Sequence, residues 1–166
     1  QNNGAVVSEG EIVVTGNSKF ANNGTLSLAC ETVDTHDELK VENGAIFENV
    51  GELSVGEDST VAVSTTSPAG TFKNSGKVSV EGAFDGKISN TGSVIIASEK
   101  DQTITVDNAD VSATVEVSKM KGTLIVTDIG MADTKKKINA GDNKIVIATT
   151  GTTKSTISGI SIAEAT

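Results

Sequence analysis

The sequence of 166 residues contains no tryptophan, no tyrosine and no arginine, and it has only one proline, one cysteine, one histidine and four phenylalanines. Sugar-binding sites are usually built on aromatic faces, and a polysaccharide lyase needs a fixed cation beside the charge that develops in its reaction. The chain offers neither tyrosine nor tryptophan for the first role and no arginine for the second. We therefore expect no enzymatic activity.

Positive charge is also scarce. Thirteen lysines face 22 acidic residues, which gives a formal net charge of −9 at pH 7. Nucleic-acid binding depends on clustered lysine and arginine, so this balance argues against a nucleic-acid partner. The only basic run, Lys135–Lys137, is expected to be a solvated loop. The longest apolar runs have four residues, Val94–Ala97 and Ile145–Ala148, whereas a membrane helix needs roughly 18, and we expect no membrane insertion.

The length and composition are those of one folded domain. Apolar residues make up 36% of the chain, and the 17 glycines bring the composition into the ordinary globular range. A lone Cys30 cannot form an internal disulfide, so cysteine usage does not identify the compartment. The chain begins with Gln1 instead of methionine, which favours an exported protein without its leader or a piece of a longer protein. We expect a secreted or cell-surface location.

A nine-residue unit recurs along the first part of the chain. Its pattern is [Phe/Ile]-x-Asn-x-Gly-x-[Leu/Val]-x-[Leu/Val/Ile], and a fragment of it, Asn2–Val6, opens the sequence. Successive asparagines of the unit are 16 to 27 residues apart. The four full copies are Phe20–Leu28, Phe47–Val55, Phe72–Val80 and Ile88–Ile96.

The apolar residues of each unit are two positions apart, which is the period of a β-strand. Turn-forming residues lie between the units, for example Glu42–Gly44 and Phe84–Gly86, and glycine and asparagine tolerate the positive φ that sharp corners demand. A meander of hairpins is the competing arrangement, but hairpins need two-residue turns between matched strands. The sequence predicts an all-β fold with the architecture of a β-solenoid.

In such a solenoid, equivalent residues of successive coils stack in columns. The first residue of the unit is predicted to form an inward column of large apolar side chains. The asparagine shares that parity and is predicted to point inward at a corner, where its amide can bond to the backbone and to the asparagines above and below. The predicted structural ladder consists of Asn22, Asn49, Asn74 and Asn90 together with Phe20, Phe47, Phe72 and Ile88.

The motif fades after about residue 97. Strand-like alternation persists, but without phenylalanine or the Asn-x-Gly corner. We divide the domain into regular coils over residues 1–96 and a divergent β region over residues 97–166, which consists either of degenerate coils or of a cap on the open end of the stack.

The repeated unit resembles the repeats of large parallel β-helix proteins of bacterial surfaces, including filamentous-haemagglutinin-like exoproteins and autotransporter-type adhesins. The resemblance covers roughly residues 2–96. It implies a right-handed parallel β-helix that forms an extended secreted stalk and holds adhesive regions away from the cell.

Few residues are candidates for chemistry. Asp34, His36 and Asp37 form the densest polar cluster, but no second histidine or cysteine has metal-ligand spacing with them, so a solvated connection is the favoured interpretation over a metal site. Cys30 continues the parity of Leu28 and is expected to be a buried, inert thiol. No cofactor is expected. The acid-rich turns Glu57–Asp58 and Asp107–Asp110 could at most bind calcium weakly.

These observations predict a non-enzymatic structural or adhesive β-solenoid of an exported bacterial protein. We expect it to pair with copies of itself or with flanking solenoid segments by strand addition, either as a filament or as part of a longer stalk. The alternative is a carbohydrate-binding or polysaccharide-cleaving β-helix, with host or environmental glycans as partners.

Overall fold

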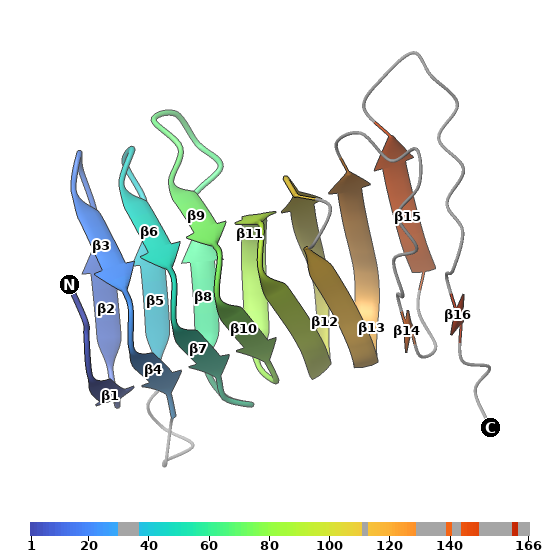
Figure 1. Cartoon of the computed structure of the whole chain (residues 1–166), viewed down its shortest axis with the longest axis horizontal. Helices are drawn as coiled ribbons and strands as arrows, with labels where there is room; N and C mark the ends of the chain where they lie inside the picture. Colours follow the sequence, from blue (N-terminus) through green and yellow to red (C-terminus); the bar gives the residue numbers. More distant parts are fainter. Residues whose placement is uncertain (30–36, 111–112, 129–138, 141–143, 150–160, 163–166) are drawn as a thin grey trace.

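A computed structural model describes residues 1–29, 37–110, 113–128, 139–140, 144–149 and 161–162. These residues form β-strands stacked along the long axis of the molecule (Figure 1). None of the described segments is a helix that is long and apolar enough to cross a bilayer. The strands are β1 (Ala5–Ser8), β2 (Glu11–Val14), β3 (Lys19–Asn22), β4 (Thr25–Leu28), β5 (Glu38–Val41), β6 (Ile46–Asn49), β7 (Glu52–Val55), β8 (Thr60–Val63), β9 (Thr71–Asn74), β10 (Lys77–Val80), β11 (Ala83–Asn90), β12 (Ser93–Asn108), β13 (Thr114–Asp128), β14 (Asn139–Ala140), β15 (Lys144–Thr149) and β16 (Ser161–Ile162).

The early coils contain three short strands each, and every strand pairs with its counterpart in the next coil. One face consists of β1, β4, β7, β10 and the start of β12; a second of β2, β5, β8 and the start of β11; and a third of β3, β6, β9 and the ends of β11 and β12. All strand pairs among the described residues are parallel. Parallel pairing excludes the hairpin meander and confirms the all-β, parallel β-solenoid fold.

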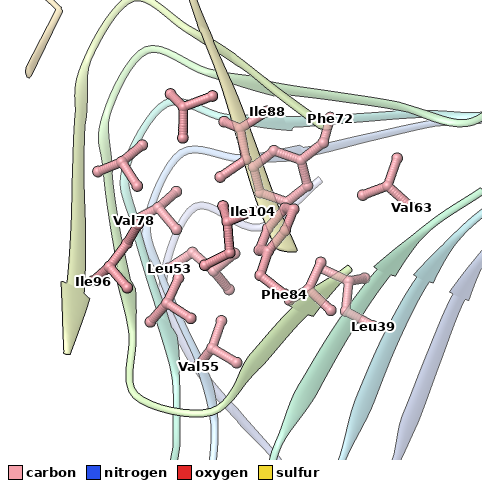
Figure 2. Close-up of a cluster of buried hydrophobic side chains, with 14 of the residues drawn as sticks. Leu39, Leu53, Val55, Val63, Phe72, Val78, Phe84, Ile88, Ile96 and Ile104 are labelled. Atoms are coloured by element: carbon pink, nitrogen blue, oxygen red, sulfur yellow. The ribbon is translucent and has the colours of Figure 1, made fainter. Parts of the chain in front are cut away.

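Alternation along each strand separates the interior from the surface. In β7, Leu53 and Val55 are buried, whereas Glu52 is exposed and Ser54 is half-buried. The β-branched and leucine side chains of all three faces meet in the centre of the coil (Figure 2). Figure 2 shows Leu53, Val55, Val78 and Ile96 from one face, Phe72, Ile88 and Ile104 from another, and Leu39, Val63 and Phe84 from the third.

Parallel stacking continues beyond residue 96, where the sequence motif fades. β12 and β13 are longer strands that each take part in two faces. The start of β13 pairs with the start of β12, and the end of β13 pairs with the end of β12 from Asp101 to Asn108. β15 then pairs with β13, and β14 pairs with β16 in a separate two-stranded sheet.

The second face ends in β11, at a place where a turn was expected. The interpretation of Phe84–Gly86 as a turn is wrong, because these residues lie within β11 and Phe84 is fully buried. Gly86 has a φ of 121°, which bends the strand from the second face into the third. A side chain, and not another strand, supplies the acceptor here: Gln102 Oε1 accepts a hydrogen bond of 2.6 Å from the backbone amide of Phe84.

Candidate functional site

A ladder of asparagine side chains runs along the corner between the third and first faces. Asn22, Asn49, Asn74 and Asn90 are the last residues of β3, β6, β9 and β11, and each is almost completely buried. The Nδ2 of each one donates to the Oδ1 of the asparagine in the next coil. The distances are 2.8 Å from Asn22 to Asn49, 2.8 Å from Asn49 to Asn74 and 2.9 Å from Asn74 to Asn90.

The second proton of each amide also has a partner. Asn22 Nδ2 donates to the carbonyl of Glu52 at 2.9 Å, and Asn74 Nδ2 donates to the carbonyl of Ser93 at 3.0 Å. Each carbonyl belongs to the first residue of a strand in the next coil, immediately after the corner. The ladder therefore satisfies buried polar groups that the bend would otherwise leave unpaired, and every amide points in the same direction along the axis.

The ladder is longer than the sequence indicates. Asn2 donates to Asn22 Oδ1 at 2.7 Å, and Asn90 donates to Asn108 Oδ1 at 2.8 Å. Asn108 was missed because the corner after it has five residues and no Asn-x-Gly before Thr114. The signal that could have found it is Val106-x-Asn108, which keeps the apolar residue two positions before the asparagine.

The large apolar side chains lie beside the ladder as a second column. Phe20, Phe47, Phe72 and Ile88 are in register in successive coils. The ring centroids of Phe20 and Phe47 are 5.4 Å apart, and those of Phe47 and Phe72 are 5.0 Å apart, both pairs stacked. Phe84, which the sequence left outside this column, contacts Phe72 edge-on at 5.2 Å from the second face.

The glycine of the unit is required by packing between coils. Positive φ occurs at Gly16, Asn43, Gly44 and Gly86, but not at the glycine of any unit. A Cβ added at Gly51 would lie 2.0 Å from the carbonyl oxygen of Gly24 in the preceding coil, and Gly24, Gly76 and Gly92 have similar contacts. The close approach of successive coils, and not a left-handed backbone, is what requires glycine here.

Of the three residues considered for a metal, the structure describes only Asp37. Asp34 and His36 lie outside the described residues, as do Cys30 and Lys135–Lys137. Among the residues that are described, no group of three histidine, cysteine, aspartate or glutamate side chains could hold a metal ion. The acid-rich turn at Asp107 connects neighbouring coils. Asp107 pairs with Lys87 at 2.7 Å, and the following residue, Asn108, belongs to the ladder.

Asp37 is the most unusual ionisable group in the described part of the chain. It precedes β5, its side chain is fully buried, and neither carboxylate oxygen has a hydrogen-bonding partner among the described residues. Desolvation is the largest effect on this carboxyl and raises its pKa above the ordinary value of 3.8. Ser59, its neighbour in the next coil, is also buried and donates to the carbonyl of Leu28 at 3.0 Å.

Charged side chains on the surface pair between coils. Lys40 lies 2.5 Å from Glu11 in the preceding coil and 3.0 Å from Glu38 in its own strand. Hydrogen bonds to these carboxylates, first Glu11 and then Glu38, raise the pKa of Lys40. Lys19 binds Glu48 in the same way at 2.6 Å. Such exposed pairs add little stability each, but they hold neighbouring coils in register.

The described surface has several open hollows. One of about 280 Å³ lies over the corner and is lined by residues such as Glu48, Lys73, Ser75 and Thr91. Its carboxylate is held by lysine, since Glu48 lies 2.6 Å from Lys19 and 3.9 Å from Lys73.

Comparison of the chain with protein-family models, with curated proteins and with solved structures finds no match in any of the three. The geometry of the ladder and the columns is therefore the basis for a functional proposal.

Proposed function

We propose that this chain is a non-enzymatic structural scaffold, a rigid segment of an extended stalk on the surface of a bacterium. The observation that carries the proposal is the continuous amide ladder from Asn2 to Asn108, which joins six coils through buried hydrogen bonds. Such bonds stabilise a rod that must keep its shape under mechanical load, because each ladder amide is buried and donates to two acceptors.

Two further features support a scaffold. The interior of the described coils is filled with apolar side chains that are nearly inaccessible to solvent. The surface ion pairs lie between coils and connect successive turns of the stack. Exported location and the likeness of the repeated unit to filamentous-haemagglutinin-like and autotransporter-type stalks are parts of the same proposal.

The proposal is tested by determining where the natural protein lies in its source organism and what shape it has there. We expect an antibody raised against residues 1–97 to label intact cells, with an antibody against a cytosolic protein as the negative control. Labelling that requires permeabilised cells would overturn the proposal.

In cells carrying Asn49→Asp, we expect electron microscopy to show shortened or bent surface projections, while Asn23→Asp on the exposed side of the corner leaves them unchanged.

A further inference from the structure

Three asparagines of the chain are followed directly by glycine, at Asn3–Gly4, Asn23–Gly24 and Asn43–Gly44. Asparagine is a thermolabile side chain. A following glycine favours its loss, because without a Cβ the glycine nitrogen can approach the side-chain Cγ closely. The pairs at Asn23 and Asn43 both lie in coils that have a neighbouring coil on each side, so their chemistry is the same and only their surroundings differ.

The backbone around Asn23 is fixed between coils. The amide of Asn23 donates to the preceding coil, and the amide of Thr25 donates to the Gly4 carbonyl, each at 2.8 Å. The space beside Gly24 is filled, since a Cβ there would lie 2.0 Å from the Gly4 carbonyl oxygen. The Gly24 nitrogen can therefore move only if neighbouring coils separate.

The turn at Asn43 is open by comparison. It connects β5 to β6, and Asn43 is exposed with a φ of 54°, in the left-handed region that asparagine tolerates in turns. The amide of Ala45 closes the turn by donating to the Glu42 carbonyl at 3.1 Å, whereas the Gly44 amide has no acceptor among the described residues. A Cβ at Gly44 would meet no atom closer than 3.5 Å. The Gly44 nitrogen thus has room to move.

The side chain of Asn43 is held only by bonds that water can reach. Its Nδ2 donates to Thr15 Oγ1 in the preceding coil at 3.0 Å and to Glu42 Oε1 at 3.2 Å, both on the surface. Exposed hydrogen bonds exchange with water at little cost. The side chain can therefore turn its Cγ towards the Gly44 nitrogen without any change in the core.

We propose that Asn43 is a site of spontaneous deamidation in the folded protein. The Gly44 nitrogen gives up its proton and forms a bond to Asn43 Cγ. The bond from Cγ to Nδ2 breaks, and the side-chain nitrogen takes up a proton and leaves as ammonia, so that a five-membered succinimide remains. Water then opens the ring at either carbonyl and gives aspartate or isoaspartate. The reaction needs no co-reactant other than water.

The modification removes a link between two coils. The new carboxylate cannot donate to Thr15, and it lies beside the carboxylate of Glu42, to which Asn43 donates before the reaction. The isoaspartate product also lengthens the backbone of the turn by one atom. We expect the turn between β5 and β6 to loosen with time, while the buried asparagine ladder stays intact.

The experiment follows the unmodified chain during incubation in mildly alkaline buffer, once folded and once unfolded in urea. Peptide mass spectrometry measures deamidation at each pair, and each folded rate is divided by the rate of the same pair in urea. We expect this ratio to be at least about tenfold higher for Asn43 than for Asn23, because Asn23 reacts only after a local opening of the coils. Equal ratios, or no reaction at Asn43 in the folded protein, would overturn the proposal.

The products test the route. Ring opening yields isoaspartate together with aspartate, whereas direct hydrolysis of the side chain yields aspartate alone. Aspartate without isoaspartate at position 43 would overturn the succinimide step.

The matched control is Asn43→Gln, which keeps a side-chain amide at this exposed position but would have to close a less favourable six-membered ring. We expect the mass change at this turn to disappear, and an unchanged rate in the variant would place the reaction elsewhere and overturn the assignment. None of these measurements depends on where the protein is located, so they succeed or fail independently of the surface-labelling test of the proposed function.

Discussion

Asn49 Nδ2 donates to Asn74 Oδ1 at 2.8 Å and to the carbonyl of Lys77 at 2.9 Å. One side chain thus connects two coils and satisfies a carbonyl beyond the corner. Because the site is buried, the loss of these donors cannot be compensated by water.

Asn49→Asp should therefore reduce the free energy of unfolding at pH 7 by at least about 3 kcal/mol, since it removes two donors and buries a charge beside two acceptors. Urea unfolding followed by circular dichroism measures the loss. Asn23→Asp is the control: the Asn23 side chain is exposed and donates to Asn3 at 3.0 Å, and its substitution should change the stability by less than about 0.5 kcal/mol. Equal losses in the two variants would contradict a buried ladder.

Phe47→Ala removes a ring that lies between Phe20 and Phe72. We expect a loss of about 3–5 kcal/mol, because the stacked column cannot collapse around the cavity. Chemical denaturation with Val50→Ala as the exposed control gives the comparison. A loss well under about 1 kcal/mol would be inconsistent with the fully buried position of Phe47.

Gly51→Ala introduces a methyl group 2.0 Å from the carbonyl oxygen of Gly24. The backbone of two coils must separate to admit it, and we expect a cost of at least about 2 kcal/mol. Gly10→Ala is a matched control, because a Cβ at Gly10 meets no atom within 4 Å. Thermal unfolding of the two variants side by side should show a lowered midpoint for Gly51→Ala alone.

Asp37→Asn should stabilise the protein at neutral pH. Because desolvation raises the pKa of Asp37 in the folded state, the folded chain holds a proton that the unfolded chain releases above its ordinary pKa of 3.8. This group therefore favours folding at low pH, and its contribution declines as the pH rises from 3.8 to the raised value.

The measurement is the urea midpoint of the wild type and of Asp37→Asn between pH 4 and pH 8. The difference should grow with pH in favour of the variant. Asp58→Asn is the control, since Asp58 is exposed and pairs with Lys100 at 3.3 Å. A variant that is less stable than the wild type at pH 7 would indicate a favourable partner for the Asp37 carboxylate.

The columns were predictable from the sequence because the interior of a solenoid repeats. Phe47 and Phe72 are 25 residues apart and directly in register, and only residues of similar size and polarity can occupy such positions in successive coils. Period-two alternation identified which side of each strand is buried, as for Leu53 and Val55. Fold class and strand register therefore followed from local patterns alone.

The remaining features depend on contacts between coils that no local pattern reports. The ring of Phe84 packs on Phe72 from another face, and its backbone amide donates to the side chain of Gln102, 18 residues later. The need for glycine at position 51 comes from the carbonyl of Gly24 in another coil. Asp37 was interpreted as part of a solvated connection, but the structure shows it fully buried.

The distance between ladder asparagines in the sequence varies widely, yet their amides remain 2.7 to 2.9 Å apart. The additional residues are accommodated in connections such as the exposed stretch Thr65–Ala69 between β8 and β9. Foreign peptides grafted into such connections would project sideways without altering the height of any coil. Two grafts on neighbouring coils would be held about 4.8 Å apart along the rod, which is the spacing of paired strands. The molecule would therefore present grafted peptides at a fixed, regular separation.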